Sequence, residues 1–181
     1  MGKRTYRERG ANWIRELSES GLATEDWRAS RLSREEVCER LAGGAGLVFY
    51  LGHGRARGWS GFQALRWHHV TAHTQKHPVG TVIAFACNTL TRTRGVVPFG
   101  THYVTSGRVA AYLGWAGSMT IEEGLRFADR VCGQLVRGQA STVSQLLRAV
   151  VAKVEDPAER RELREMRLLG WPFAPLPSRF L

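Results

Sequence analysis

Two short, continuously apolar segments limit the folds that this chain can adopt. Residues 47–51 (LVFYL) and 81–86 (TVIAFA) are rich in strand-forming residues. Because they lack the polar alternation of a half-exposed strand, we expect strands buried on both faces. Between them a helix is predicted over about 61–75, and Pro78 and Gly80 end it. Two buried strands joined by a helix favour a parallel βαβ unit and an α/β fold.

Helices and shorter β-type runs make up the rest of the chain. Capping residues or apolar spacing predict five helices: 11–18, Ser33 to Gly43, Thr120 to 135, 143–154, and Asp156 to Gly170. Two further β-type runs lie at 103–105 and 109–113. The helix after Asp156 is mostly charged, so we expect it to face solvent.

Length and charge exclude several classes of protein. A chain of 181 residues suggests one domain, and three scattered cysteines do not form the disulfide framework of a small secreted protein. No apolar signal segment follows the basic N-terminus, and His102 and Arg108 interrupt the longest apolar stretch, 96–116. We therefore expect a cytoplasmic protein without membrane contact.

The acidic residues are distributed unevenly. The formal net charge is +10, yet residues 40–121 contain no Asp or Glu, while all six His and eight Lys or Arg lie there. This stretch by itself therefore excludes paired-carboxylate hydrolysis, an Asp-backed Ser/His triad and carboxylate metal ligands.

A histidine and a cysteine follow the two predicted strands. Residues 52–54 (GHG) come after the first strand, and 86–89 (ACNT) end the second. Because the carboxyl ends of parallel strands meet at one edge of the sheet, we expect His53 and Cys87 to lie close together. Thiol catalysis needs a cysteine nucleophile and a histidine that accepts its proton. The alternative is a turn histidine beside a buried free thiol.

The order of several short segments resembles that of the caspase-like (clan CD) cysteine peptidases, in particular gingipain-type and bacterial CHAT-domain members. The resemblance covers about residues 33–177. Its segments are YLGHG at 50–54, GWSG at 58–61, ACNT at 86–89, FG at 99–100, GRVAAYLGW at 107–115 and LLGWP at 168–172, where Trp171 replaces the usual Asp. It implies a three-layer sandwich with a mostly parallel central sheet flanked by helices.

The resemblance also implies a reaction and the residues that perform it. The chain would be a cysteine endopeptidase that acts on a protein or peptide and needs no cofactor or metal. His53 would be the general base and acid, and Cys87 would attack the scissile carbonyl. The backbone N–H groups of Gly54 and Cys87 would form the oxyanion hole. The family uses a Cys–His dyad without an obligatory acid, so the missing carboxylates are no objection.

On the substrate side, the resemblance places an extended peptide beside residues 114–117. We predict Arg55, Trp59 and Trp115 as substrate-binding residues, although either tryptophan could instead pack in the core. Relatives that cleave after Arg or Lys use a carboxylate in the specificity pocket. Glu122 or Glu123 could supply one only if the loop after Trp115 folds back, so we expect acidic or neutral specificity. The arginines that follow the two strands agree with this, because guanidinium groups pair with carboxylates: Arg55, Arg57, Arg92 and Arg94.

The predicted domain boundaries leave the start of the family's core open. Residues 33–177 would form the peptidase domain, 178–181 a tail, and 1–32 a helical extension or an incomplete start of the domain. The family core begins with a strand–helix–strand unit that residues 1–32 do not contain. The first core strand is therefore either missing or supplied by a partner chain or an upstream domain.

Other functions and sites compete with this interpretation. A catalytically silent binding module would use the basic surface to hold nucleic acid or an acidic protein, although no nucleic-acid-binding motif is recognisable. His69, His73 and His77 have the spacing of one helix face, but we interpret them as a polar face rather than a metal site. Cys38 and Cys132 lie on apolar helix faces and are predicted to pack in the core.

Overall fold

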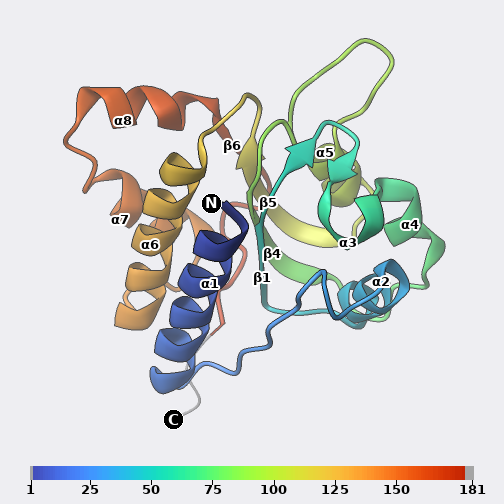
Figure 1. The fold of residues 1–181 in the computed structure, drawn as a ribbon, viewed down its shortest axis with the longest axis horizontal. Coiled ribbons are helices and arrows are strands. Elements are labelled where there is room, and N and C mark those ends of the chain that lie inside the picture. Colours follow the sequence, from blue (N-terminus) through green and yellow to red (C-terminus); the bar gives the residue numbers. More distant parts are fainter. Residues whose placement is uncertain (1, 178–181) are drawn as a thin grey trace.

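A four-stranded sheet forms the centre of the computed structural model, which describes residues 2–177 (Figure 1). The strand order is β1-β4-β5-β6. The strands are β1 (Leu47–Leu51), β4 (Val79–Phe85), β5 (Val109–Trp115) and β6 (Met166–Gly170). β1, β4 and β5 are parallel, and β6 is antiparallel to β5. The predicted strand at 47–51 is confirmed, the second begins two residues earlier than expected, and the third extends to Trp115.

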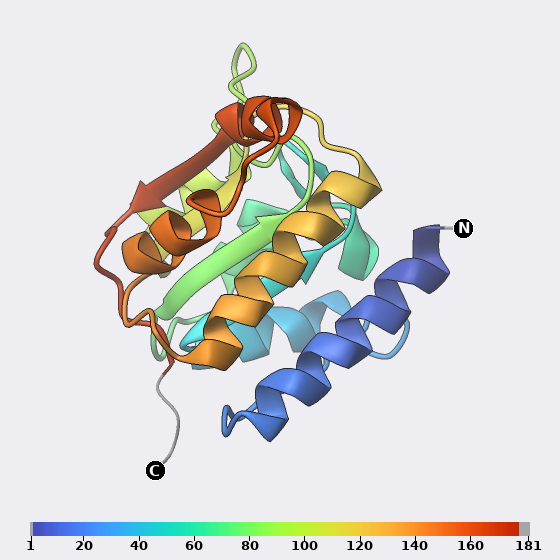
Figure 2. The same ribbon diagram turned by 90° about the vertical axis from the view of Figure 1, so that its left-hand side faces the viewer.

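Helices cover both faces of the sheet. One face packs against α2 (Arg34–Gly43), α4 (Trp67–Ala72) and α5 (Phe99–Thr105). The other packs against α1 (Gly2–Glu19), α6 (Ile121–Arg137) and α7 (Val143–Val151), as Figure 2 shows. These three layers confirm the predicted α/β sandwich with a mostly parallel sheet. In the described part of the chain, no helix is long and apolar enough to cross a membrane.

The capping residues read from the sequence begin the helices as expected. Ser33 and Thr120 each accept a hydrogen bond from the backbone three residues later, where a glutamate completes a capping box. Asp156 caps the short helix α8 (Pro157–Glu162) by accepting from the Ala158 N–H. Local signals of this kind predict where a helix begins better than where it ends.

Two predictions near the end of the sheet are wrong. The run 103–105 belongs to α5, because Phe99 and Tyr103 lie one helical turn apart and are both buried. The helix from Asp156 ends at Glu162 rather than Gly170. A short 3₁₀ helix, η1 (Leu163–Glu165), follows, and then β6 pairs with β5. Tertiary pairing overrides the helical pattern there.

The predicted helix over 61–75 is also largely replaced. A hairpin of β2 (Gly54–Arg55) and β3 (Gly58–Trp59) comes first, and α3 (Gly61–Ala64) is a turn with left-handed φ at Phe62, Gln63 and Ala64. The chain turns back at this point because Gly58 bridges to Arg66 and the Trp59 N–H donates to Leu65. A continuous helix cannot make those contacts, so only α4 is regular.

The N-terminal segment is helical from Gly2, which is longer than the predicted 11–18. Its helix α1 packs on α6, where the Trp13 indole donates to Asp129 at 2.8 Å. Arg9 pairs with the same carboxylate at 3.4 Å. Residues 2–46 contain no strand. The predicted tail 178–181 lies outside the described residues.

Candidate active site

The register of the sheet brings His53 and Cys87 to the same edge. Leu51 of β1 pairs with Phe85 of β4, and each candidate residue lies two positions beyond its strand. The contact between the two loops is close, because a Cβ added at Gly54 would lie 2.5 Å from the Cys87 carbonyl oxygen and 2.9 Å from the Ala86 Cβ. Only glycine fits at this position.

The main chain of His53 is fixed, whereas its imidazole is exposed. The His53 carbonyl accepts hydrogen bonds from the Tyr50 hydroxyl at 2.9 Å and from the Ser60 N–H at 2.8 Å. Within residues 2–177 no hydrogen bond joins the imidazole to Cys87 or to any other side chain. The imidazole is therefore oriented only through the backbone of its loop.

The thiol of Cys87 is half-buried and contacts the loop between β5 and α6. Its Sγ donates to the Met119 carbonyl at 3.2 Å and accepts from the Met119 N–H at 3.3 Å. Backbone bonds hold this loop in place, since Asn88 N–H donates to Gly117 and Leu90 N–H donates to Trp115, both at 2.9 Å. The loop after Trp115 therefore folds back over the cysteine.

A pocket lies beside the Met119 loop. Its lining consists of Trp115, Ser118, Met119, Phe127, Leu163 and the three acids Glu123, Glu159 and Glu165. Of these three acids, the sequence indicated only Glu123, as one possibility. No local signal could have found the other two, because β6 pairing alone brings their segment to the end of β5.

Two of the three pocket acids already have partners. Both terminal guanidinium nitrogens of Arg130 donate to the Glu159 carboxylate, and the Nη2 to Oε2 distance is 2.8 Å. These hydrogen bonds lower the pKa of Glu159. Glu123 accepts from the Thr120 N–H in its capping box. Glu165 is exposed and lies beside Gly117. The pocket is thus less negative than its composition indicates.

The predicted substrate-binding residues fall in different environments. Arg55 is exposed next to the His53 loop. Trp115 is 3% exposed and lines the pocket. Trp59 differs from the prediction, because it is 1% exposed and stacks on Tyr50 in the core. In this structure Trp59 cannot touch a substrate.

The remaining cysteines and histidines lie elsewhere. As predicted, Cys38 and Cys132 are core residues, each 1% exposed. Burial raises the pKa of the Cys38 thiol to about 11 and raises that of Cys132 further. His69 caps α4 by accepting from the Arg66 N–H at 3.0 Å. Among the described residues, no three His, Cys, Asp or Glu side chains are grouped as a metal site.

A mostly parallel sheet whose neighbouring strands β1 and β4 place a histidine and a cysteine at one edge defines the class of caspase-like cysteine peptidases. The sequence profile of peptidase family C25 matches residues 3–177, and the chain belongs to this family. No curated protein matches the chain in sequence.

Solved structures share the fold at low sequence identity. The Arg-specific cysteine proteinase gingipain R superposes with a TM-score of 0.75 at 15% identity, over 95% of this chain and 43% of that chain. The complex of pro- and mature domains of Porphyromonas gingivalis RgpB gives 0.68 at 16%, over 94% and 44%. A structure described as a protease gives 0.61 at 17%, over 78% and 37%. This chain therefore spans less than half the length of these proteins.

Proposed function

We propose that this chain hydrolyses peptide bonds as a cysteine endopeptidase, with Cys87 as the nucleophile and His53 as the general base and acid. The observation that carries the proposal is the contact between the two strand-end loops, where Gly54 lies against the Cys87 carbonyl. Family membership supports the same reaction class.

The proposed reaction follows from what each group can donate or accept. His53 takes the thiol proton, and the Cys87 sulfur attacks the scissile carbonyl. The N–H groups of Gly54 and Cys87 stabilise the oxyanion. The imidazolium then protonates the departing amine, and water hydrolyses the thioester. Because the thiol donates to Met119 in the resting structure, this hydrogen bond must break before the proton reaches His53.

Replacing the nucleophile tests this reaction. Cys87→Ala and His53→Gln should each abolish cleavage of a sensitive peptide library while keeping the thermal unfolding profile of the wild type. Cys38→Ala is the matched control, because that thiol is buried away from the sheet edge, and it should retain turnover. Unchanged turnover in Cys87→Ala would remove the proposed dyad.

For specificity we propose an acidic or neutral residue at the cleavage site. Exposed arginines in both strand-end loops support this preference: Arg55, Arg57, Arg92 and Arg94. The opposing charges are Glu165 and Glu123, since Arg130 offsets only Glu159. Arg55→Gln should slow cleavage after Glu relative to Ala. The preference for an acidic or neutral residue would be refuted if the wild type cleaved efficiently after Arg and Glu165→Gln abolished that cleavage.

We further propose that the sheet is completed by a partner chain or another domain. β1 is an edge strand, and no strand pairs with its outer side within the described residues. The gingipain chains are more than twice as long, and one is in complex with a pro-domain. A cytoplasmic location also remains our proposal, and the free thiols of Cys38, Cys87 and Cys132 agree with it.

A further inference from the structure

The hydroxyl of Tyr50 joins the His53 loop to the turn that follows β3. It donates to the His53 carbonyl at 2.9 Å and accepts from the Gly61 N–H at 3.0 Å. Tyr50 itself is 6% exposed. One buried hydroxyl therefore bridges the two ends of the β2–β3 hairpin, which the hydrogen bond from the Ser60 N–H to the His53 carbonyl also joins.

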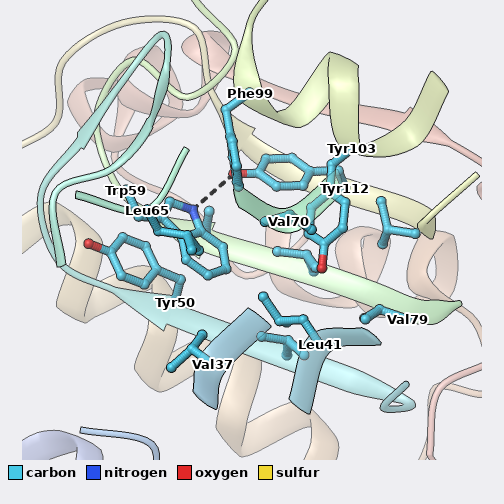
Figure 3. Packing of buried hydrophobic residues seen from close by; sticks show 14 of the residues in the cluster. Val37, Leu41, Tyr50, Trp59, Leu65, Val70, Val79, Phe99, Tyr103 and Tyr112 are labelled. Carbon is cyan, nitrogen blue, oxygen red and sulfur yellow. Dashed lines mark hydrogen bonds between the residues drawn. The ribbon is translucent and has the colours of Figure 1, made fainter. Parts of the chain in front are cut away.

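The fold leaves room for this hydroxyl and holds its ring. Tyr50 stacks on Trp59 with ring centroids 4.2 Å apart and planes 4° apart (Figure 3). The Trp59 indole in turn donates to the Tyr112 hydroxyl at 3.3 Å. A Cβ at Gly52 would lie 2.9 Å from the Tyr50 oxygen, and one at Gly61 would lie 3.2 Å from it. Glycine at both positions lets the two backbones approach the phenol.

Burial keeps the phenol in its donating form. It raises the pKa of Tyr50 to about 12, so the hydroxyl stays protonated at neutral pH. The carbonyl that accepts this hydrogen bond belongs to a residue whose exposed imidazole has no hydrogen-bond partner among residues 2–177. The main chain that carries the imidazole is held by two hydrogen bonds to one carbonyl, from Tyr50 and Ser60.

We propose that Tyr50 is a positioning residue for the dyad, which presents the His53 imidazole to Cys87 by fixing the His53 main chain. This inference rests on the proposed function. Tyr50 does not touch the substrate or the sulfur. It acts through His53, and small misplacements of a catalytic group slow reactions strongly, by up to about a hundredfold for about 1 Å.

Tyr50→Phe removes the hydroxyl and keeps the stacked ring. We expect kcat for peptide hydrolysis to fall by about tenfold, with KM within about twofold. Tyr103→Phe is the matched control, because the Tyr103 hydroxyl is also buried but has no hydrogen-bond partner in the described part of the chain. That variant should keep the wild-type kcat. Equal kcat in Tyr50→Phe and wild type, or an equal fall in both variants, would overturn the proposal.

Alkylation of Cys87 by iodoacetamide separates this proposal from the proposed function. A nearby imidazolium lowers a thiol pKa, so His53 should support alkylation below about pH 7. His53→Gln should lose this reactivity, and Tyr50→Phe should lose most of it while reacting normally near pH 10, where free thiols in general react without a base. The dyad would be refuted if the wild type showed neither peptide hydrolysis nor alkylation that depends on His53. If His53-dependent alkylation is present in the wild type and fully retained in Tyr50→Phe, only the proposed role of Tyr50 would be refuted, and the dyad would stand.

A second variant covers the case in which Tyr50→Phe does not fold. Ser60→Pro removes the other hydrogen bond to the His53 carbonyl, and the Ser60 φ of −78° already suits proline. It should lower kcat in the same way, without changing alkylation near pH 10. An unchanged kcat in a folded Ser60→Pro protein would show that fixing this carbonyl has no effect on the dyad.

Discussion

Gly124 on α6 offers a way to test how the Met119 loop controls the thiol. The end of the Met119 side chain occupies the space beside Gly124, so a methyl group added at Gly124 would overlap the Met119 Cε. The backbone of the same residue holds the Cys87 sulfur. The overlapping atom is the free end of a flexible side chain, so Gly124→Ala displaces the Met119 side chain first. We expect this displacement to shift the loop that carries Met119, while the alanine favours the helix. Gly133→Ala, in the same helix, is the matched control because its nearest neighbour, Arg137, would lie 3.7 Å away.

The magnitudes follow from helix propensity and packing. Replacing glycine by alanine inside a helix contributes about 1 kcal/mol, so Gly133→Ala should raise the Tm by roughly 2–4 °C in a chain of this size. Gly124→Ala gains the same amount and loses about 1 kcal/mol, the low end of overpacking costs, because a flexible side chain can move. Its Tm should therefore rise less than that of Gly133→Ala. Releasing the thiol from the Met119 carbonyl removes a hydrogen bond of about 1 kcal/mol, which corresponds to about fivefold faster alkylation.

Iodoacetamide labelling at neutral pH measures this effect, followed by intact-mass analysis. Cys38 and Cys132 are each 1% exposed, so the folded protein should take up one label, and Cys87→Ala should take up none. Gly124→Ala should label about fivefold faster than wild type, and Gly133→Ala should label at the wild-type rate. Equal rates in the two alanine variants would refute the view that the Met119 loop restrains the thiol.

Three further outcomes test the fold. Leu146→Ala, at a fully buried position of α7, should lower the free energy of unfolding in guanidinium chloride by about 2–5 kcal/mol, and a loss below about 1 kcal/mol would contradict its core position. Ser33→Ala should cost about 1 kcal/mol in the same assay, because it removes the cap that accepts from the Glu36 N–H; no change would argue against the capping box. The pKa of Glu159 is lowered by Arg130, so the pair stabilises the fold above the usual Glu value of 4.5 and this contribution disappears as pH falls below it. Glu159→Gln should therefore show a flatter dependence of stability on pH in that acidic range, and an unchanged slope would refute the assigned pairing.

The parts of the fold that could be predicted are those with a local or periodic signal. The segments that became β1 and β4 are apolar throughout because both faces of their sheet are covered. Parallel strands end at one edge, so the proximity of the His53 and Cys87 loops followed from the strand order alone. The capping boxes at Ser33 and Thr120 depend on residues only three apart.

Contacts between distant segments were decided only by the tertiary structure. β6 lies in a charged region with a helical pattern, and it forms a strand because β5 offers an unpaired edge. This pairing brings Glu165 beside Gly117, which no spacing in the sequence indicates. Trp59 appears in a polar loop segment but is buried against Tyr50, because the hairpin folds its ring into the core.

The sequence by itself determined the layered α/β class, the neighbouring strands β1 and β4, and the end of the sheet at which a histidine and a cysteine meet. It did so because burial on both faces and helix capping each leave a short-range pattern. The tertiary structure decided what surrounds those two residues: the Met119 loop over the thiol, the acids of the pocket and the Tyr50 hydroxyl on the His53 carbonyl. The first two bring together segments that meet only after the sheet has formed. Tyr50 and His53 are three residues apart, but the hydroxyl is held in place by the stacking of its ring on Trp59, so packing fixes this contact as well.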